Sequence, residues 1–186
     1  MDKEKKKIEF RKRVLYNLRK QRVNNYKKDK LIIKSLLEFI KSSDIKNIML
    51  FIPLKTEPNI EPLIKLLRES GYNLYVPFME RDTFKLVKYR LPLNKKKFGI
   101  KEPKNSYLYI KKIDLAIVPL LGIDRSCRRI GFGKGMYDRF YSKFGKKIDK
   151  TLFLQRDIYF TKEVITNSYD ITADYFFANS IKFIDI

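Results

Sequence analysis

Short apolar runs alternate with amphipathic stretches along this chain, and this alternation constrains its fold more than any other feature. Residues 48–52 form a continuous apolar run of strand length, and residues 113–118 form a second one, interrupted only by Asp114. Such runs are typical of strands that are buried on both faces of a parallel sheet. Further strands are predicted over residues 73–77, 84–89, 151–155 and 175–178.

Helical segments fill the intervals between these strands. Apolar residues recur at helical spacing twice within residues 1–42, and again over residues 60–69, which Gly71 ends. The alternation of strand and helix predicts an α/β fold: a single-domain, three-layer α/β/α sandwich with a mostly parallel central sheet, Rossmann-like in character. In such sheets ligands bind beyond the carboxyl ends of the strands.

The length and composition predict one domain. The 186 residues, 44% of them hydrophobic, suffice for one sizeable core, and no repeat or linker divides them. We therefore expect one domain over residues 1–186, with two N-terminal helices within residues 1–42 packed on the α/β core. No stretch approaches the ~20 apolar residues of a membrane span, and no secretory signal is evident. A soluble, cytoplasmic monomer is expected.

Residue usage excludes several kinds of catalytic site. The chain has no histidine and one cysteine, Cys127, so a histidine general base, a Cys/His zinc site and a disulfide framework are all excluded. Lys, Arg, Tyr, Asp, Glu and backbone amides remain. That inventory suits the binding and neutralisation of a polyphosphate better than the shuttling of protons.

The net charge of +21 points to a polyanionic ligand. The first thirty residues hold 13 basic and four acidic side chains, so part of this charge is concentrated near the N-terminus. A basic nucleic-acid-binding protein is one interpretation, supported by the aromatic content of 14%. Lysines on solvated faces, or a small multiply charged ligand, explain the charge equally well.

A glycine-rich run marks the most informative candidate site. Gly131, Gly133 and Gly135 fall within five residues, between the strand at 113–118 and a short amphipathic helix. Their amides would lie at a helix N-terminus, where anions bind. The spacing matches neither the dinucleotide fingerprint nor a Walker A loop. On spacing alone, a flexible turn is as good an interpretation as a phosphate site.

Charged neighbours favour the phosphate interpretation. Arg129 and Lys134 flank the amides, and Asp138 falls on the first turn of the helix with a carboxylate free for a hard cation. Amides, two cations and one carboxylate together indicate a nucleotide–magnesium site.

The residues from Val118 to Phe140, which contain this run, resemble the signature of the 5-formyltetrahydrofolate cyclo-ligase family, also called methenyltetrahydrofolate synthetases. The resemblance extends along the chain in the right order. Lys7, Phe10 and Arg11 are similar to the family's N-terminal Lys-x-x-Leu-Arg, and residues 98–103 (Phe-Gly-Ile-Lys-Glu-Pro) are similar to its Phe-Gly-Ile-x-Glu-Pro block. Glu57, Gln155 and Asp170 fall where the family has the same residues.

The resemblance implies a ligase of one-carbon metabolism that depends on ATP and Mg²⁺. Its reaction converts 5-formyltetrahydrofolate to 5,10-methenyltetrahydrofolate and releases ADP and phosphate. The formyl oxygen attacks the γ-phosphate, N10 closes onto the activated carbon, and phosphate leaves. The substrate is a folate that can carry a polyglutamate tail.

The resemblance also implies the site residues. Catalysis falls to Lys134 and Arg129, folate contacts to Ile52 and Glu57, and magnesium ligation to Asp138 and Asp170. The residues implied for ATP are Lys7, Arg11, Arg129, Ile130, Gly131, Phe132, Gly133, Lys134, Gly135, Met136 and Tyr137.

Four positions depart from the family pattern. Met136 replaces an aromatic residue or glycine, Cys127 replaces a turn glycine, Ile60 replaces a threonine, and Leu120 replaces a glycine. A diverged relative that keeps ATP but acts on another formylated or amide substrate is therefore a third interpretation, beside the cyclo-ligase and the nucleic-acid-binding protein.

Overall fold

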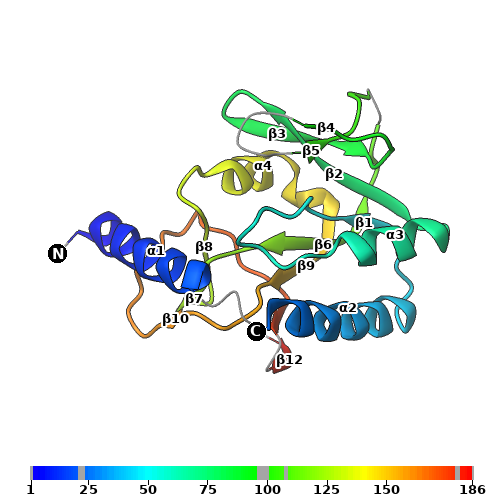
Figure 1. The fold of residues 1–186 in the computed structure, drawn as a ribbon. Coiled ribbons are helices and arrows are strands. Elements are labelled where there is room, and N and C mark those ends of the chain that lie inside the picture. Colours follow the sequence, from blue (N-terminus) through cyan, green and yellow to red (C-terminus); the bar gives the residue numbers. More distant parts are fainter. Residues whose placement is uncertain (1, 21–23, 96–100, 107–108, 179–180, 186) are drawn as a thin grey trace.

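The structure is a computed structural model that describes residues 2–20, 24–95, 101–106, 109–178 and 181–185. A seven-stranded sheet in the order β12-β11-β9-β6-β1-β2-β3 forms its centre (Figure 1). The five inner strands are parallel, and the outer strands β3 and β12 are antiparallel to their neighbours. The strands of this sheet are β1 (Asn47–Met49), β2 (Asn73–Glu80), β3 (Thr83–Lys88), β6 (Ile113–Pro119), β9 (Ile148–Leu154), β11 (Tyr175–Ala178) and β12 (Ile181–Asp185).

Helices cover both faces of the sheet. One face packs against two helices, α2 (Asn25–Lys41) and α3 (Glu61–Glu69), through a cluster that includes Leu36 and Leu63. The other face packs against α4 (Met136–Phe144), which continues into the short 3-10 helix η2 (Gly145–Lys147), and Phe140 of α4 lies in that second cluster. The molecule thus has three layers.

Successive side chains of the inner strands are buried alternately on the two faces of the sheet. In β6, Leu115 and Ile117 belong to the α2/α3 side, whereas Ala116 and Val118 belong to the α4 side. Successive side chains of a strand point to opposite faces, so a strand covered on both faces needs apolar residues at nearly every position. The apolar runs of the sequence therefore become the inner strands.

A small second sheet lies beyond the carboxyl end of β6. It contains β10 (Phe160–Thr161), β7 (Gly122–Asp124) and β8 (Arg129–Ile130), in that order. The first helix, α1 (Lys3–Lys20), packs on this sheet through Phe10 and Val14, which share a cluster with Ile130. A two-stranded pair, β4 (Asn94–Lys95) with β5 (Lys101–Glu102), completes the strands of the described residues.

The predicted fold class is confirmed: the protein is α/β, with a mostly parallel central sheet between helices. Two strand boundaries differ from the prediction. The strand β1 ends at Met49 although the apolar run continues to Ile52, because the chain leaves the sheet there toward the site. The strand β2 continues through Pro77 to Glu80. Proline lacks an N–H, and the β1 side of β2 has no partner strand beyond Tyr75, so no hydrogen bond is lost at Pro77.

The segment between β6 and α4, for which the sequence predicts no strand, contains the β7–β8 hairpin. The polar run between these strands resembles a loop in the sequence, and each strand is only two or three residues long. Phe98, Gly99 and Ile100 of the resemblance to the cyclo-ligase family lie outside the described residues.

Candidate active site

The glycine-rich run connects β8 to α4 at the carboxyl end of β6 (Figure 1). Gly135 is the N-cap of α4 and has a φ of 61°, in the left-handed region that glycine tolerates best. Gly131 lies directly under the guanidinium of Arg129, where a Cβ atom would collide with that group. Glycine is therefore favoured at both positions, for backbone conformation at Gly135 and for close approach at Gly131.

A cavity of about 240 Å³ opens beside this run. Six of the residues expected to bind ATP line it, and so do the two residues expected to contact folate, Ile52 and Glu57. The structure thus brings together residues from the ends of β1 and β6 and from the start of α4. The six expected ATP residues are Arg129, Phe132, Lys134, Gly135, Met136 and Tyr137.

Glu57 is the buried acid of this cavity, with 5% of its surface exposed. Its Oε2 accepts a hydrogen bond from the backbone N–H of Leu54 at 2.8 Å, which holds the side chain in the turn after β1. Burial raises the pKa of Glu57 to about 7, against the opposing effects of that hydrogen bond and of Arg129 and Arg156. Glu57 is therefore poised to change its charge near neutral pH.

Arg129 lines the same cavity and provides a buried positive charge. Its Nε donates to the carbonyl of Pro119 at 2.9 Å, and its guanidinium lies 4.7 Å from the centre of the Tyr137 ring. Burial lowers the pKa of Arg129, and the nearby Asp138 carboxylate opposes that shift. A guanidinium fixed on two sides is held in place for an anionic group in the cavity.

The Tyr137 ring also contacts Phe84 of β3 in an edge-to-face arrangement, with 5.0 Å between the ring centres. Burial raises the pKa of the Tyr137 phenol far above its usual range. The phenol is therefore neutral at physiological pH and serves as an apolar wall with one hydroxyl.

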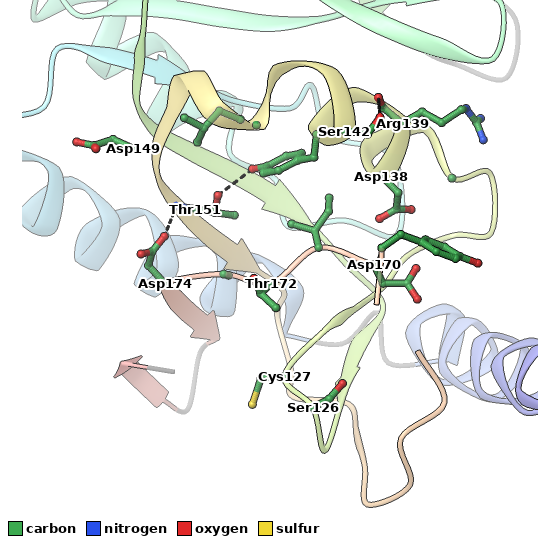
Figure 2. Close-up of a pocket in the computed structure, with 17 residues that line it drawn as sticks. Ser126, Cys127, Asp138, Arg139, Ser142, Asp149, Thr151, Asp170, Thr172 and Asp174 are labelled. Atoms are coloured by element: carbon green, nitrogen blue, oxygen red, sulfur yellow. Dashed lines mark hydrogen bonds between the residues drawn. The ribbon is translucent and has the colours of Figure 1, made fainter. Parts of the chain in front are cut away.

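A larger cavity of about 1040 Å³ lies on the other side of α4 (Figure 2). It shares Gly135 with the smaller cavity, so the glycine-rich run separates the two. Figure 2 shows Asp138, from α4, and Asp170, from the loop that precedes β11, on the same side of this cavity. At its far end, Asp149 and Asp174 are paired with Lys112 and Lys150.

The expected ATP residues Lys7 and Arg11 of α1 line neither of these two cavities. They contact the segments that form the site. The Lys7 Nζ lies 2.6 Å from the Oδ2 of Asp170 in a buried ion pair. Arg11 donates through Nε to the carbonyl of Gly131 at 3.0 Å and pairs with Glu4. These contacts tie α1 to the glycine-rich run and to the loop that carries Asp170.

The residues at the larger cavity fit a magnesium ion that is bound together with phosphates. The Oδ1 of Asp138 is buried and has no hydrogen-bond partner among the described residues. The Oδ2 of Asp170 is occupied by Lys7 and by the N–H of Asn167, which leaves Oδ1 as the oxygen to offer. No cluster of three His, Cys, Asp or Glu residues suited to a metal occurs within the described ranges. Mg²⁺ commonly takes one or two carboxylates and completes its shell with phosphates and water, and two carboxylates suffice for that.

Ile130 is the one expected ATP residue whose side chain points into the core, where it packs with Phe10 and Val14 of α1. Its carbonyl accepts a hydrogen bond from the N–H of Leu121. Any contribution of Ile130 to a ligand would have to come from its backbone.

The four departures from the family pattern fall in different places. Leu120 and Ile60 are fully buried in the two core clusters and line neither cavity. Met136 lines the smaller cavity and Cys127 the larger one. Leu120 and Ile60 therefore support a diverged relative with another substrate less than the sequence indicated.

Cys127 has a φ of 56°, in the left-handed region, which explains why a glycine suits this position. We expect Cys127→Gly to stabilise the protein by about 0.5–1 kcal/mol, because the relief of left-handed strain exceeds the extra unfolded-state entropy of glycine. Urea unfolding of the two proteins checks this. Cys127→Ala, which keeps the Cβ atom, is the control and should give no such gain.

Sequence analysis missed two buried polar networks that position these loops. Arg156, after β9, makes a two-pronged ion pair with Asp29 of α2 at 2.7 and 2.9 Å, and it reaches the carbonyl of Thr56 beside Glu57. Asp124 accepts hydrogen bonds from Ser126 and from Thr166. No local motif marks such residues, although a charged residue within an apolar segment was an available signal for Asp124.

The lining of the smaller cavity also includes residues outside the expected set. Pro77 and Met79 of β2, Phe84 of β3 and Lys101 of β5 contribute to it. The sequence indicated strands near these positions, but it could not show that the β2–β3 hairpin extends over the carboxyl end of β1.

Comparisons with known proteins identify relatives across nearly the whole chain. The profile of the 5-formyltetrahydrofolate cyclo-ligase family matches residues 3–170, a range that contains Lys7 and Asp170. A 5-formyltetrahydrofolate cyclo-ligase of Mycoplasma genitalium is 32% identical over 143 residues, which are 73% of this chain and 77% of the relative. The enzyme of the same name from Haemophilus influenzae is 28% identical over 142 residues, 69% of this chain and 76% of the relative.

Solved structures agree on the fold. The NMR structure of 5,10-methenyltetrahydrofolate synthetase from Aquifex aeolicus superposes with a TM-score of 0.78 at 24% identity, and covers 94% of this chain and 90% of its own. A 5,10-methenyltetrahydrofolate synthetase from Mycoplasma pneumoniae gives a TM-score of 0.71 at 21% identity, with 91% and 96% covered. Within the described ranges, no helix has the length and apolar character needed to cross a membrane.

Proposed function

The chain belongs to the 5-formyltetrahydrofolate cyclo-ligase family, and from that premise we propose that it converts 5-formyltetrahydrofolate to 5,10-methenyltetrahydrofolate at the expense of ATP, with ADP and phosphate as the other products. The observation that carries this proposal is the smaller cavity, where the buried acid Glu57 faces the glycine-rich run and Arg129. We place the reaction in the cytoplasm.

The smaller cavity suits the pterin end of the folate. Its walls are apolar, from Ile52, Met136 and Tyr137 among others, and Glu57 is its buried carboxylate. In this arrangement Met136 and Tyr137, which the resemblance assigned to ATP, would contact the folate instead. A pterin ring presents adjacent N–H donors on one edge, which match a carboxylate, while the flat ring packs against apolar and aromatic side chains. Glu57 then orients the ring and holds the formyl group toward the glycine-rich run.

The nucleotide would lie on the other side of that run, in the larger cavity. Gly135 lines both cavities, and Lys134 and Arg129 lie on the substrate side of it. A triphosphate that follows the run would bring its terminal phosphate to the boundary between the cavities. The formyl oxygen and the phosphate would then meet beside two fixed cations.

Charge neutralisation and orientation are the chemical tasks of these residues. The formyl oxygen is a weak nucleophile, so the protein contributes by holding it in line with the phosphate and by stabilising negative charge on the phosphate oxygens. Arg129 and Lys134 supply positive charge, and the amides of the run supply dipoles. The Asp138 and Asp170 carboxylates would hold Mg²⁺, which neutralises phosphate charge when bound.

The Asp138→Asn substitution tests the magnesium assignment. We expect turnover to fall at least tenfold with the fold intact, because asparagine keeps the shape but loses the charge that attracts the cation. The Mg²⁺ concentration for half-maximal activity should rise in parallel. Ser142→Ala, on the same wall of the larger cavity, is the control, and normal Mg²⁺ dependence of Asp138→Asn would refute the assignment.

The experiment that tests the reaction itself is a spectrophotometric assay with purified protein, 5-formyltetrahydrofolate, ATP and Mg²⁺. Formation of methenyl-folate absorbance that requires all three additions is the expected result. A folded protein that binds ATP yet forms no methenyl-folate would overturn the folate substrate and favour a diverged relative. Loss of ATP binding as well would favour the interpretation as a basic nucleic-acid-binding protein.

A further inference from the structure

A third cavity, of about 610 Å³, lies between α4 and β3 and takes no part in the proposed reaction. Its floor is apolar and largely aromatic. Phe84, Phe140 and Phe144 form a continuous series, with ring centres 4.4 and 5.1 Å apart and interplanar angles of 22° in both pairs. Because rings stacked in this way cover one another's faces, they present their edges to the cavity, and the face of a flat ring packs favourably on such edges.

The rim of this cavity is positively charged. Lys143 at the end of α4 and Lys147 of η2 both line it. The Lys147 Nζ lies 4.9 Å from the centre of the Tyr109 ring and 5.4 Å from that of Phe144. The Lys147 Nζ also donates to the carbonyl of Ile110 at 3.5 Å, and in the described part of the chain neither Lys143 nor Lys147 forms an ion pair. The charge of a third lysine that lines the cavity, Lys85, is neutralised by an ion pair with Glu80 at 3.0 Å.

Two hydroxyl groups add a polar component. The Oγ1 of Thr83 and the Oγ of Ser106 are buried, and neither has a hydrogen-bond partner among the described residues. Both residues line this cavity. Unpaired buried hydroxyls are unfavourable and rare in folded proteins, and an acceptor on a ligand would satisfy them.

We propose that this cavity is a binding site for a planar aromatic carboxylate. The ring lies on the Phe84–Phe140–Phe144 floor, and the carboxylate faces Lys143 and Lys147 with the hydroxyls within reach. An inorganic anion would leave the aromatic floor uncovered, and a neutral ring would leave both ammonium groups without a carboxylate. The site is separate from the reaction, although Phe84 also lines the smaller cavity, and the inference does not depend on the proposed function.

Titration of the full chain with 2-naphthoate tests this site by calorimetry and by amide chemical shifts. Saturable 1:1 binding is expected, with shifts concentrated in β3 and α4. The double variant Lys143→Gln/Lys147→Gln should bind at least tenfold more weakly. Lys146→Gln is the matched control, because Lys146 is an exposed neighbour that does not line this cavity, and it should retain the wild-type affinity.

Thr83→Val provides a second test that does not remove charge. Valine keeps the shape of threonine, so the ligand-free protein should be at least as stable as the wild type, while 2-naphthoate binds several-fold more weakly. The site would be refuted by absent or non-saturable binding, by equal affinity in the double lysine variant, or by equal affinity for the neutral analogue 2-naphthamide.

Discussion

Replacement of Arg129 by methionine is expected to lower the turnover number by about 10²- to 10³-fold, the size of effect seen when a fixed donor to developing negative charge is lost. Arg129 is buried, bonded to the Pro119 carbonyl and stacked on Tyr137, so its charge is held in place before any ligand arrives. A mobile surface cation could not replace it. Methionine fills much of the same volume and removes only the charge and the donors.

Two comparisons make this prediction specific. Arg125→Met alters an exposed arginine four positions earlier and should leave turnover unchanged. Arg129→Lys restores the charge without the planar two-sided contact and should recover only part of the activity. Circular dichroism and thermal unfolding show whether the variants are folded. Turnover within threefold of the wild type in a folded Arg129→Met protein would contradict the assignment of Arg129 to the reacting phosphate.

The Glu57→Gln substitution is expected to have opposite effects on stability and on activity. Because burial raises the pKa of Glu57 from 4.5 to about 7, the native state holds the proton more tightly than the unfolded state. The contribution of Glu57 to the free energy of unfolding therefore falls as pH rises from about 4.5 to 7, by up to roughly 3 kcal/mol. Glutamine carries no charge, so the variant should be more stable than the wild type at pH 8 and no more stable near pH 4.

Activity should change in the other direction. If the ionised carboxylate binds the donor edge of the pterin, the KM of the wild type for 5-formyltetrahydrofolate should rise as pH falls from 8 to 6, and Glu57→Gln should have a high KM that does not follow this dependence. Urea unfolding across pH and steady-state kinetics give the two readouts. Glu69→Gln, at the exposed end of α3, is the control. A wild-type KM that is constant from pH 6 to 8 would exclude ionised Glu57 from substrate binding.

The sequence was sufficient for those parts of the fold that depend on local pattern. Apolar runs such as residues 113–118 became strands buried on both faces, and the amphipathic segments became helices on the two sides of the sheet. The β7–β8 hairpin was not predictable, since strands of two or three residues have no measurable periodicity. The extension of β2 past Pro77 depends on where β1 leaves the sheet, which is a tertiary effect.

The candidate site, like the fold, was predictable from the sequence only in part. The glycine-rich run and its flanking cations were recognisable from residue type and spacing, and Glu57 only through the resemblance to the cyclo-ligase family. Sequence could not reveal that Lys7 pairs with Asp170, that Arg156 with Asp29 supports the Thr56 turn, or that Phe84 separates two cavities. These relations join residues that are far apart in the chain, and only the packed structure brings them together.

The ion pair between Lys7 and Asp170 joins α1 to the loop before β11, and its two residues are 163 positions apart in the chain. During synthesis on the ribosome, α1 can form soon after it emerges, but Lys7 meets its partner only after another 163 residues have been added. A fragment that ends before Asp170 would therefore keep α1 and lose this anchor. Contacts between residues so distant in sequence form late in folding, so we expect α1 to dock after the segments between these residues have been made.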